Sequence, residues 1–292
     1  MFPLPWEGAG ERVIQLDVIH TIAELRKRLK GEPSIALVPT LGNLHAGHIS
    51  LVTLAQAHGR CVVATIFVNR LQFEVGGDFE RYPRTLEDDV RKLQAAGCHV
   101  VFAPDEKEMY PEPQKVHVTP PGVAAALEGD FRPGHFQGVC TVVAKLFHVA
   151  TPHAAIFGKK DYQQLRVIRE LERQLAFGIE IVGGETVREP DGLAMSSRNG
   201  YLSADERAKA PQLNRELMKV KAAIEAGSHR LHRHEEMAAA DLALAGWKVD
   251  YIAVRSQASL GVPGPHDKDL VVLGAAWLGK TRLIDNLEIK LG

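Results

Sequence analysis

The chain has 292 residues, with 35 lysines and arginines against 36 aspartates and glutamates, a formal charge of −1 and 45% hydrophobic residues. The hydrophobic content excludes a disordered chain, and the balanced charge argues against nucleic acid as a main partner. No apolar run approaches the roughly 18 residues that span a bilayer, and residues 1–17 lack the pattern of a signal peptide, so we expect a cytoplasmic protein with no membrane partner. Cys61, Cys98 and Cys140 lie among aliphatic residues, which predicts buried thiols and neither disulfides nor a zinc site.

The first half of the chain alternates short apolar runs with segments of helical periodicity. The run at 61–68 is an unbroken series of β-branched or apolar residues, which is typical of a central parallel strand. Strands separated by helices form parallel βαβ units with right-handed crossovers, so the pattern predicts an α/β fold with a doubly wound parallel sheet. We expect its strands at 35–39, 61–68, 100–103, 154–157 and 179–182, and its helices at 46–59, 85–96, 139–150 and 162–177.

The alternation of predicted strands and helices ends after residue 184. A polar, turn-rich segment at 188–200 leads into a mostly helical stretch at 203–245, and strand patterns follow it. This mixture predicts a first domain of residues 1–186 and a smaller α+β C-terminal domain of residues 187–292. The strands of the second domain are expected at 247–254, 270–273 and 282–289.

The sharpest local signal is the segment 39–48, Pro-Thr-Leu-Gly-Asn-Leu-His-Ala-Gly-His, where a strand ends and a helix begins. The i,i+3 spacing places His45 and His48 on one face of the helix start. The free N–H groups and the positive dipole end there favour phosphate and disfavour a charged imidazole, so both rings could act as neutral hydrogen-bonding groups. Gly42 and Gly47 would let the backbone approach a nucleotide. The alternatives are capping or surface histidines, and a zinc site is weaker because no third ligand is apparent.

Two amides, Asn69 and Gln72, follow the strand at 61–68, and polar residues continue through 78–84. Ligands of a doubly wound sheet bind beyond the carboxyl ends of its strands. The amides could therefore bind a hydroxyl or a carboxylate of a ligand, although an ordinary polar loop has the same composition.

Two later segments carry charge at similar positions. Residues 158–164 lead from a strand into a helix through a glycine and two lysines, which suit phosphate, and Asp161, which suits magnesium or a ribose. A solvated helix start is the alternative. Residues 191–200 carry two serines and Arg198 on a glycine-bounded loop, which indicates either a mobile anion clamp or a plain interdomain linker.

Residues 274–281 match the G-x-x-x-x-G-K-[ST] pattern of a P-loop. We do not interpret them as one, because Ala-Ala-Trp-Leu is bulky and apolar for a phosphate cradle. The residues that follow alternate like a strand and do not open a helix. Too little chain remains after Thr281 to complete a parallel nucleotide-hydrolase core.

In this order, these segments resemble the pantothenate synthetase (pantoate–β-alanine ligase) family, whose His-x-Gly-His motif also occurs in cytidylyltransferases and class I aminoacyl-tRNA synthetases. The resemblance extends from Ile35 to Ile289 and implies a Rossmann-like fold of the nucleotidyltransferase type. The family commonly has Met where Leu41 stands, which is a volume-conserving exchange. It often has Pro where Arg70 stands, which puts the shape of this loop in question. The further matching segments are 82–85, 131–138 and 279–286.

The resemblance implies an enzyme, a ligase that forms an amide bond between (R)-pantoate and β-alanine. ATP would first convert pantoate into pantoyl adenylate with release of pyrophosphate, and β-alanine would then displace AMP to give pantothenate, a coenzyme A precursor. Mg²⁺ would be held by the ATP phosphates and by no protein ligand, and the protein would be a homodimer.

The resemblance also implies roles for individual residues. His45, His48, Lys160 and Arg198 would be catalytic, with His48 as the central imidazole. The pantoate ligands would be Gln72 and Gln164. The ATP site would consist of Leu41, Gly42, Asn43, Leu44, His45, Ala46, Gly47, His48, Gly158, Lys159, Lys160, Asp161, Val187, Met195, Ser196, Ser197 and Arg198.

Three other functions share part of this pattern. A nucleotidyltransferase with another acceptor, such as a cytidylyltransferase, would keep the histidine motif. A synthetase acting on tRNA is disfavoured by the neutral charge and by the lack of an anticodon-binding extension. A catalytically silent nucleotide-binding protein is disfavoured by the presence of His45, His48, Lys160 and Arg198.

Overall fold

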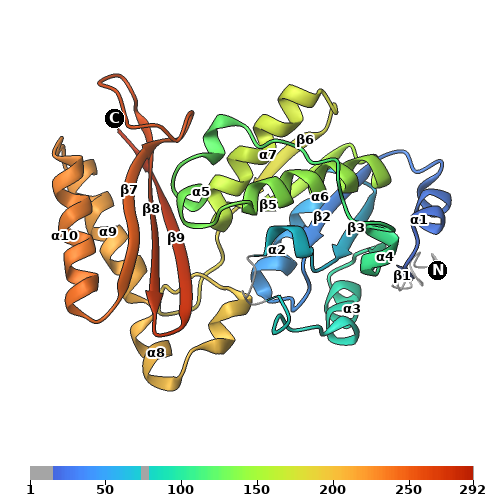
Figure 1. Cartoon of the computed structure of the whole chain (residues 1–292), viewed down its shortest axis with the longest axis horizontal. Helices are drawn as coiled ribbons and strands as arrows, with labels where there is room; N and C mark the ends of the chain where they lie inside the picture. Colours follow the sequence, from blue (N-terminus) through green and yellow to red (C-terminus); the bar gives the residue numbers. More distant parts are fainter. Residues whose placement is uncertain (1–15, 74–78, 292) are drawn as a thin grey trace, which may run out of the picture.

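Two β-sheets organise the protein in a computed structural model that describes residues 16–73 and 79–291. Figure 1 shows a parallel sheet formed by strands between residues 17 and 184 and, beside it, an antiparallel sheet formed by the end of the chain. The six strands of the first sheet are β1 (Asp17–Ile19), β2 (Ile35–Thr40), β3 (Cys61–Ile66), β4 (Val100–Phe102), β5 (Ala154–Gly158) and β6 (Glu180–Gly184).

The parallel sheet has the order β1-β4-β3-β2-β5-β6, and every neighbouring pair is parallel. The chain moves outward from β2 through β3 to β4, and then returns to the other side of β2 with β5. The order therefore reverses between β2 and β5, and a crevice beyond the carboxyl ends of the strands is expected there. This arrangement confirms the predicted doubly wound sheet.

Alternation along the strands divides the core of this sheet into two layers. Ile35 and Leu37 of β2 point to one face, whereas Ala36 and Val38 point to the other. The first face is covered by α1 (Ile22–Leu29), α6 (His135–Ala150) and α7 (Tyr162–Leu175). The second face is covered by α2 (Ala46–Ala55) and α3 (Leu86–Ala95).

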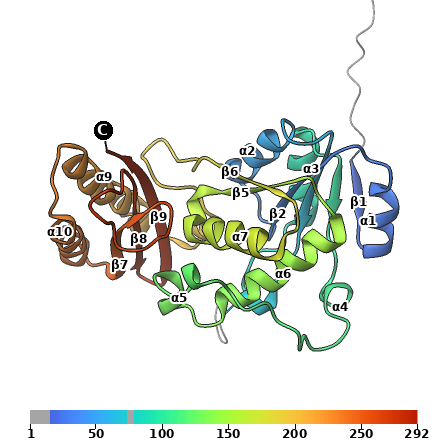
Figure 2. The ribbon, with the colours of Figure 1, turned by 90° about the horizontal axis from the view of Figure 1, so that it is seen from above.

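The antiparallel sheet has the order β7-β8-β9 and is covered by helices on both faces. The helices α9 (Gln212–Glu225) and α10 (Leu231–Leu244) pack on one face, and α5 (Glu128–Phe131) and α7 lie on the other, as Figure 2 shows. A short α8 (Ala204–Lys209) precedes these helices. The strands are β7 (Lys248–Ser256), β8 (Asp269–Leu278) and β9 (Thr281–Lys290).

The apparent P-loop is part of this antiparallel sheet. Its first residues lie within β8, and Leu278 pairs with Thr281 across the two-residue turn Gly279-Lys280. A hairpin cannot open a helix at the end of a parallel strand as a P-loop does. The rejection of the P-loop is confirmed.

Several short elements complete the described chain and were not predicted. They are α4 (Glu106–Met109) and four 3-10 turns: η1 (Arg70–Gln72), η2 (Gly122–Ala124), η3 (Lys159–Asp161) and η4 (Ser197–Tyr201).

The three cysteines are buried free thiols, as predicted, and burial raises the pKa of each. In the described parts of the chain, no helix is both long and apolar enough to cross a membrane.

Candidate active site

Two adjoining cavities lie where the strands of the parallel sheet end. The inner cavity has a volume of about 220 Å³ and is lined by residues at the carboxyl ends of β2, β3 and β5 and by residues of α6. The outer cavity has a volume of about 780 Å³ and is lined by residues of both halves of the chain. Both cavities are lined by Phe73, Arg132, Lys160, Asp161, Ser196 and Arg198, so the two meet at these side chains. The inner cavity occupies the place that the reversal of strand order predicts.

Most of the residues predicted from the sequence line the inner cavity. They are Leu41, His45, Gly47, His48, Gln72, Gly158, Lys160, Asp161, Gln164, Val187, Met195, Ser196, Ser197 and Arg198. The remaining predicted residues belong to the same turns but do not line either of these two cavities. They are Gly42, Asn43, Leu44, Ala46 and Lys159.

His45 and His48 cap the start of α2 and line the inner cavity. The Gly47 N–H donates to His45 Nδ1 over 3.1 Å, and the His45 N–H donates to His48 Nδ1 over 3.3 Å. Because each Nδ1 is an acceptor, each neutral ring carries its proton on Nε2. A side chain on Gly47 would place its Cβ 2.9 Å from Cε1 of His45, so this geometry requires glycine there.

The two imidazoles are neutral at pH 7. Burial, helped by the cation of Lys160, lowers the pKa of His45 to about 4. Burial, together with His45 and Lys160, lowers the pKa of His48 to about 3. The ring centroids are only 4.0 Å apart, so protonation of one ring would also oppose protonation of the other. The site therefore presents two Nε2–H donors with no charge of their own.

The turn between β2 and α2 is held by Asp89, which the sequence analysis missed. Asp89 is fully buried, and its two carboxylate oxygens accept the N–H groups of Asn43 and Leu44, both over 2.8 Å. The Thr85 hydroxyl also donates to Asp89 over 3.0 Å. These two backbone donors are thus used to fix the turn that precedes His45.

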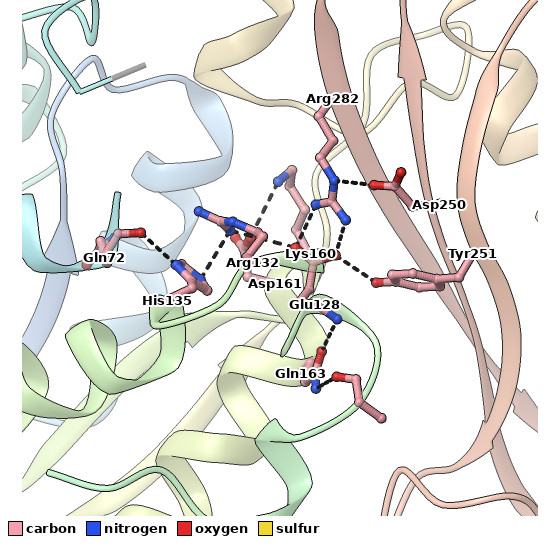
Figure 3. Close-up of polar contacts among 11 residues, drawn as sticks. Gln72, Glu128, Arg132, His135, Lys160, Asp161, Gln163, Asp250, Tyr251 and Arg282 are labelled. Carbon is pink, nitrogen blue, oxygen red and sulfur yellow. Dashed lines mark hydrogen bonds and ion pairs between the residues drawn. The ribbon is translucent and has the colours of Figure 1, made fainter. Parts of the chain in front are cut away.

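Gln72 is fixed by two side chains that converge on it. Asn69 is fully buried, and its Nδ2 donates to Gln72 Oε1 over 3.0 Å and to the Gly138 carbonyl over 3.2 Å. With its Oε1 engaged, Gln72 has its Nε2 group to offer to a ligand. His135 Nδ1 donates to the Gln72 carbonyl over 2.9 Å, as Figure 3 shows. His135 was not predicted as a site residue, although it lies in a segment that carried the family resemblance.

The turn η1 lies directly against α6. A Cβ at Gly138 would collide with the Leu71 carbonyl oxygen, so only glycine permits this approach. Arg70, which stands where the resembling family often has proline, has an exposed side chain that pairs with Glu106 over 2.9 Å. Of the following polar segment, Asp78 lies outside the described residues.

The two consecutive lysines have different surroundings. Lys160 lines both cavities, with its Nζ 3.7 Å from Asp161. Lys159 instead pairs with Glu185 over 2.6 Å and with Glu288 of β9 over 3.0 Å. The structure thus brings Lys160 to the histidine pair and directs Lys159 to the C-terminal sheet.

An apolar wall faces the amides and was also missed by the sequence analysis. Its residues come from β3, β5 and one face of α6, and helical periodicity alone does not distinguish such a face from the ordinary core. They are Phe67, Val139, Val142, Val143, Leu146 and Phe157.

A buried ion-pair network joins the antiparallel sheet to the rim of the site (Figure 3). Arg282 of β9 donates to both carboxylate oxygens of Glu128 over 2.7 and 2.8 Å, and its Nε donates to Asp250 over 2.7 Å. Tyr251 also donates to Glu128, over 2.9 Å. The cation of Arg282 holds the pKa of Glu128 below its usual value despite burial. The network fixes the segment that carries Arg132.

The fold and the site define an α/β protein of the nucleotidyltransferase type. Its distinguishing features are a doubly wound sheet, a cavity where the strand order reverses, a pair of neutral histidines at the start of a helix, and a lysine after the neighbouring strand.

The sequence model of the pantoate-beta-alanine ligase family matches residues 17–288, and the chain belongs to this family. It is 57% identical over 275 residues to the pantothenate synthetase of Thiobacillus denitrificans, covering 94% of this chain and 97% of that one. It is 56% identical to the pantothenate synthetase of Nitrosospira multiformis, covering 94% and 98%. The family, the fold and the enzyme class predicted from the sequence are confirmed.

Solved structures agree with this assignment. The crystal structure of a pantothenate synthetase from Thermus thermophilus superposes with a TM-score of 0.89 at 43% identity, covering 94% of this chain and 99% of that one. A pantoate-beta-alanine ligase from Francisella tularensis, complexed with beta-gamma ATP and beta-alanine, superposes with a TM-score of 0.79 at 31% identity, covering 94% and 97%.

Proposed function

We propose that this chain condenses (R)-pantoate with β-alanine to pantothenate, with cleavage of ATP to AMP and pyrophosphate through a pantoyl adenylate. The observation that carries the proposal is a single cavity with three kinds of group: the Nε2–H donors of His45 and His48, the ammonium of Lys160, and the amides of Gln72 and Gln164. The first two suit phosphate and the third suits a hydroxy acid. The Francisella ligase, which was solved in complex with beta-gamma ATP and beta-alanine, supports the same reaction here.

The inner cavity suits pantoate, which has a carboxylate, two hydroxyls and two methyl groups on one carbon. Gln72 Nε2 and Gln164 would hold its oxygens, and the apolar wall would contact the two methyl groups. The wall excludes water from the carboxylate, which makes that oxygen a better nucleophile.

In the first step, a carboxylate oxygen of pantoate attacks the α-phosphorus of ATP, and the bond from that phosphorus to pyrophosphate breaks. Negative charge grows on the phosphoryl oxygens, and His45, His48, Lys160 and Arg198 would stabilise it. Neutral donors suit the histidines because they need no reorganisation of protons as the charge develops. Mg²⁺ would enter with ATP as part of the substrate, bound to its phosphates.

In the second step, the amine of β-alanine attacks the acyl carbon of the adenylate. The C–N bond forms, the bond to AMP breaks, and the amine loses a proton. The outer cavity, which meets the inner one at Lys160 and Arg198, would give β-alanine access to that carbon.

We also propose that residues 1–186 and 187–292 are separate domains, that the second covers the active site, and that the protein is a cytoplasmic homodimer. The domain boundary is supported by the buried clusters, because the core of the antiparallel sheet begins at Leu193. The dimer and the location are supported by the family resemblance alone.

Exchange of labelled pyrophosphate into ATP tests the proposed function. We expect exchange with pantoate and magnesium in the absence of β-alanine, because an adenylate with no amine to consume it can only return to ATP or hydrolyse. Omission of pantoate should stop the exchange. Exchange that required β-alanine would overturn the two-step scheme, exchange independent of pantoate would indicate another acceptor, and release of ADP would indicate a kinase.

Replacing Gln72 or Gln164 by leucine should weaken pantoate binding by about 1–3 kcal/mol and leave ATP binding close to normal, because a polar substrate atom would then face an apolar group. Calorimetric titration with each ligand measures the two effects. Gln174→Leu is the matched control, since Gln174 lies on the same helix as Gln164 but is exposed. Equal losses for ATP and pantoate would contradict the assignment of the two amides.

A further inference from the structure

Asn286 of β9 is bound to the backbone of the turn that carries Lys160. Its Nδ2 donates to the carbonyl oxygens of both Lys159 and Lys160, each over 2.9 Å. The side chain is buried, with 6% of its surface exposed. One carboxamide from the antiparallel sheet thus fixes two consecutive peptide groups of the parallel sheet's active-site turn.

Asp285, the neighbour of Asn286 in β9, holds the segment that leads to Met195 and Arg198. The carboxylate of Asp285 accepts hydrogen bonds from both terminal nitrogens of Arg188, over 2.7 and 2.8 Å. Arg188 also donates to the Asn286 carbonyl over 3.2 Å. Arg188 pairs through its backbone with Ala194, directly before Met195 and the two serines. Two adjacent residues of β9 therefore tie together the turn with Lys160 and the segment that ends at Arg198.

Lys160 needs such support because its turn is short. It lies in a 3-10 turn of three residues, and its long side chain has four rotatable bonds between the backbone and the ammonium. A displacement of about 1 Å at a reacting centre can cost about 10²-fold in rate. A shift of the peptide groups of Lys159 and Lys160 would move the Lys160 backbone and its ammonium with it, and the two bonds from Asn286 oppose such a shift.

We propose that Asn286 is a positioning residue for Lys160: by holding the carbonyl groups of Lys159 and Lys160, it places the Lys160 ammonium against the phosphates of ATP. The inference rests on the proposed function, since it concerns the same nucleotide site. It extends that function to a residue of the C-terminal sheet that does not touch the substrates.

A double-mutant cycle with Asn286→Ala and Lys160→Ala tests the proposal. In the wild-type background, Asn286→Ala should lower the rate of pantoate-dependent pyrophosphate exchange about 10- to 100-fold. In the Lys160→Ala background it should lower the rate less than 2-fold, because the group that it positions is absent. Equal losses in the two backgrounds would mean a general structural role and would overturn the proposal.

Glu288→Gln is the matched control. Glu288 lies on the same strand and contacts Lys159 and Tyr162 across the same interface, without touching the Lys160 backbone. We expect it to keep the exchange rate within about 2-fold of wild type, and a loss as large as that of Asn286→Ala would overturn the proposal. If Asn286→Ala does not fold, Asn286→Leu replaces it in the cycle, because leucine has nearly the shape of asparagine but cannot donate to either carbonyl.

The ATP affinities of the four proteins, measured by calorimetry, separate this inference from the proposed function. Absence of exchange in the wild type would overturn the proposed function. The positioning role would still predict that Asn286→Ala weakens ATP binding with Lys160 present and leaves it unchanged with Lys160 absent, and any other pattern overturns it.

Discussion

Replacement of His48 by alanine is expected to lower the adenylation rate by about 10²–10³-fold, the loss typical of removing one donor to a transition state. The physical reason is the tautomer of His48. Its Nδ1 accepts the His45 N–H, so its Nε2–H is free to donate to the phosphoryl oxygens as their charge grows. Pantoate-dependent pyrophosphate exchange measures this step. A variant that kept more than a third of the wild-type rate would show that His48 is not catalytic.

His48→Asn separates catalysis from folding. The ring also completes the cap of α2, and loss of a cap costs about 0.5–2 kcal/mol of stability. Asparagine is a good acceptor for a cap, but its side chain is too short to carry a donor to the position of Nε2. We therefore expect His48→Asn to recover the stability lost in His48→Ala and to remain as slow. Recovery of activity by asparagine would mean that only the cap matters.

The lowered pKa values give the same assignment a second test. His45 and His48 have pKa values of about 4 and about 3 in the folded protein, against 6.5 for an unperturbed imidazole. The exchange rate should therefore pass through pH 6.5 without a step that belongs to these residues. The unfolded chain takes up their protons below pH 6.5 while the folded chain does not, so their contribution to stability falls as the pH is lowered from 6.5 toward 4.

The sequence predicted the central strands and the edge strand β6 well but missed β1 at the other edge of the sheet. β2, β3 and β5 are continuous apolar runs because both faces of a parallel strand are buried. β1 is a pairing of three residues at the edge, and α1 buries only Leu25 and Leu29. A strand of three residues is too short for its alternation to be recognised, and its existence depends on β4, with which it pairs. The helix α1, by contrast, has the apolar spacing of an amphipathic helix at Ile22, Leu25 and Leu29, and the sequence analysis overlooked it.

The candidate site divides in the same way. His45, His48 and Lys160 could be predicted because each follows a strand end, which is a local feature of the sequence. Asp89 and Asn286 could not. Asp89 lies in the first turn of α3, more than 40 residues along the chain from the turn that it holds, and Asn286 lies in a strand more than 120 residues away from Lys160. Only the packing of the elements brings these partners to the site.

Sequence alone also could not predict which of Lys159 and Lys160 faces the cavities. Both lysines follow the same strand and carry the same charge, so sequence alone assigns both to phosphate. The Lys159 ammonium pairs with Glu185 and with Glu288 of β9. Asn286 of β9, by contrast, binds only the backbone carbonyls of the two lysines and leaves the Lys160 ammonium to the cavities. The local pattern therefore identifies the turn, and long-range contacts select the lysine.

Lys160→Ala should lower the adenylation rate about 10²–10³-fold and weaken the binding of ATP, whereas Lys280→Ala should leave both near normal. The Lys160 ammonium lies at the meeting point of the two cavities, close to the histidine pair whose pKa values it helps to lower. Lys280 borders the outer cavity from the exposed turn between β8 and β9, where an antiparallel hairpin replaces the strand and helix of a P-loop. Titration with ATP and the exchange rate distinguish the two lysines.

A P-loop enzyme gives the opposite result, because its lysine reaches the β- and γ-phosphates and its loss removes ATP binding. If Lys280→Ala abolished ATP binding while Lys160→Ala did not, the nucleotide site would belong to the hairpin, and the inner cavity would have some other ligand. If both variants bound ATP normally but only Lys160→Ala lost the exchange, the ammonium would act on the transition state alone. Lys160 would then be catalytic but would not contribute to the affinity for ATP.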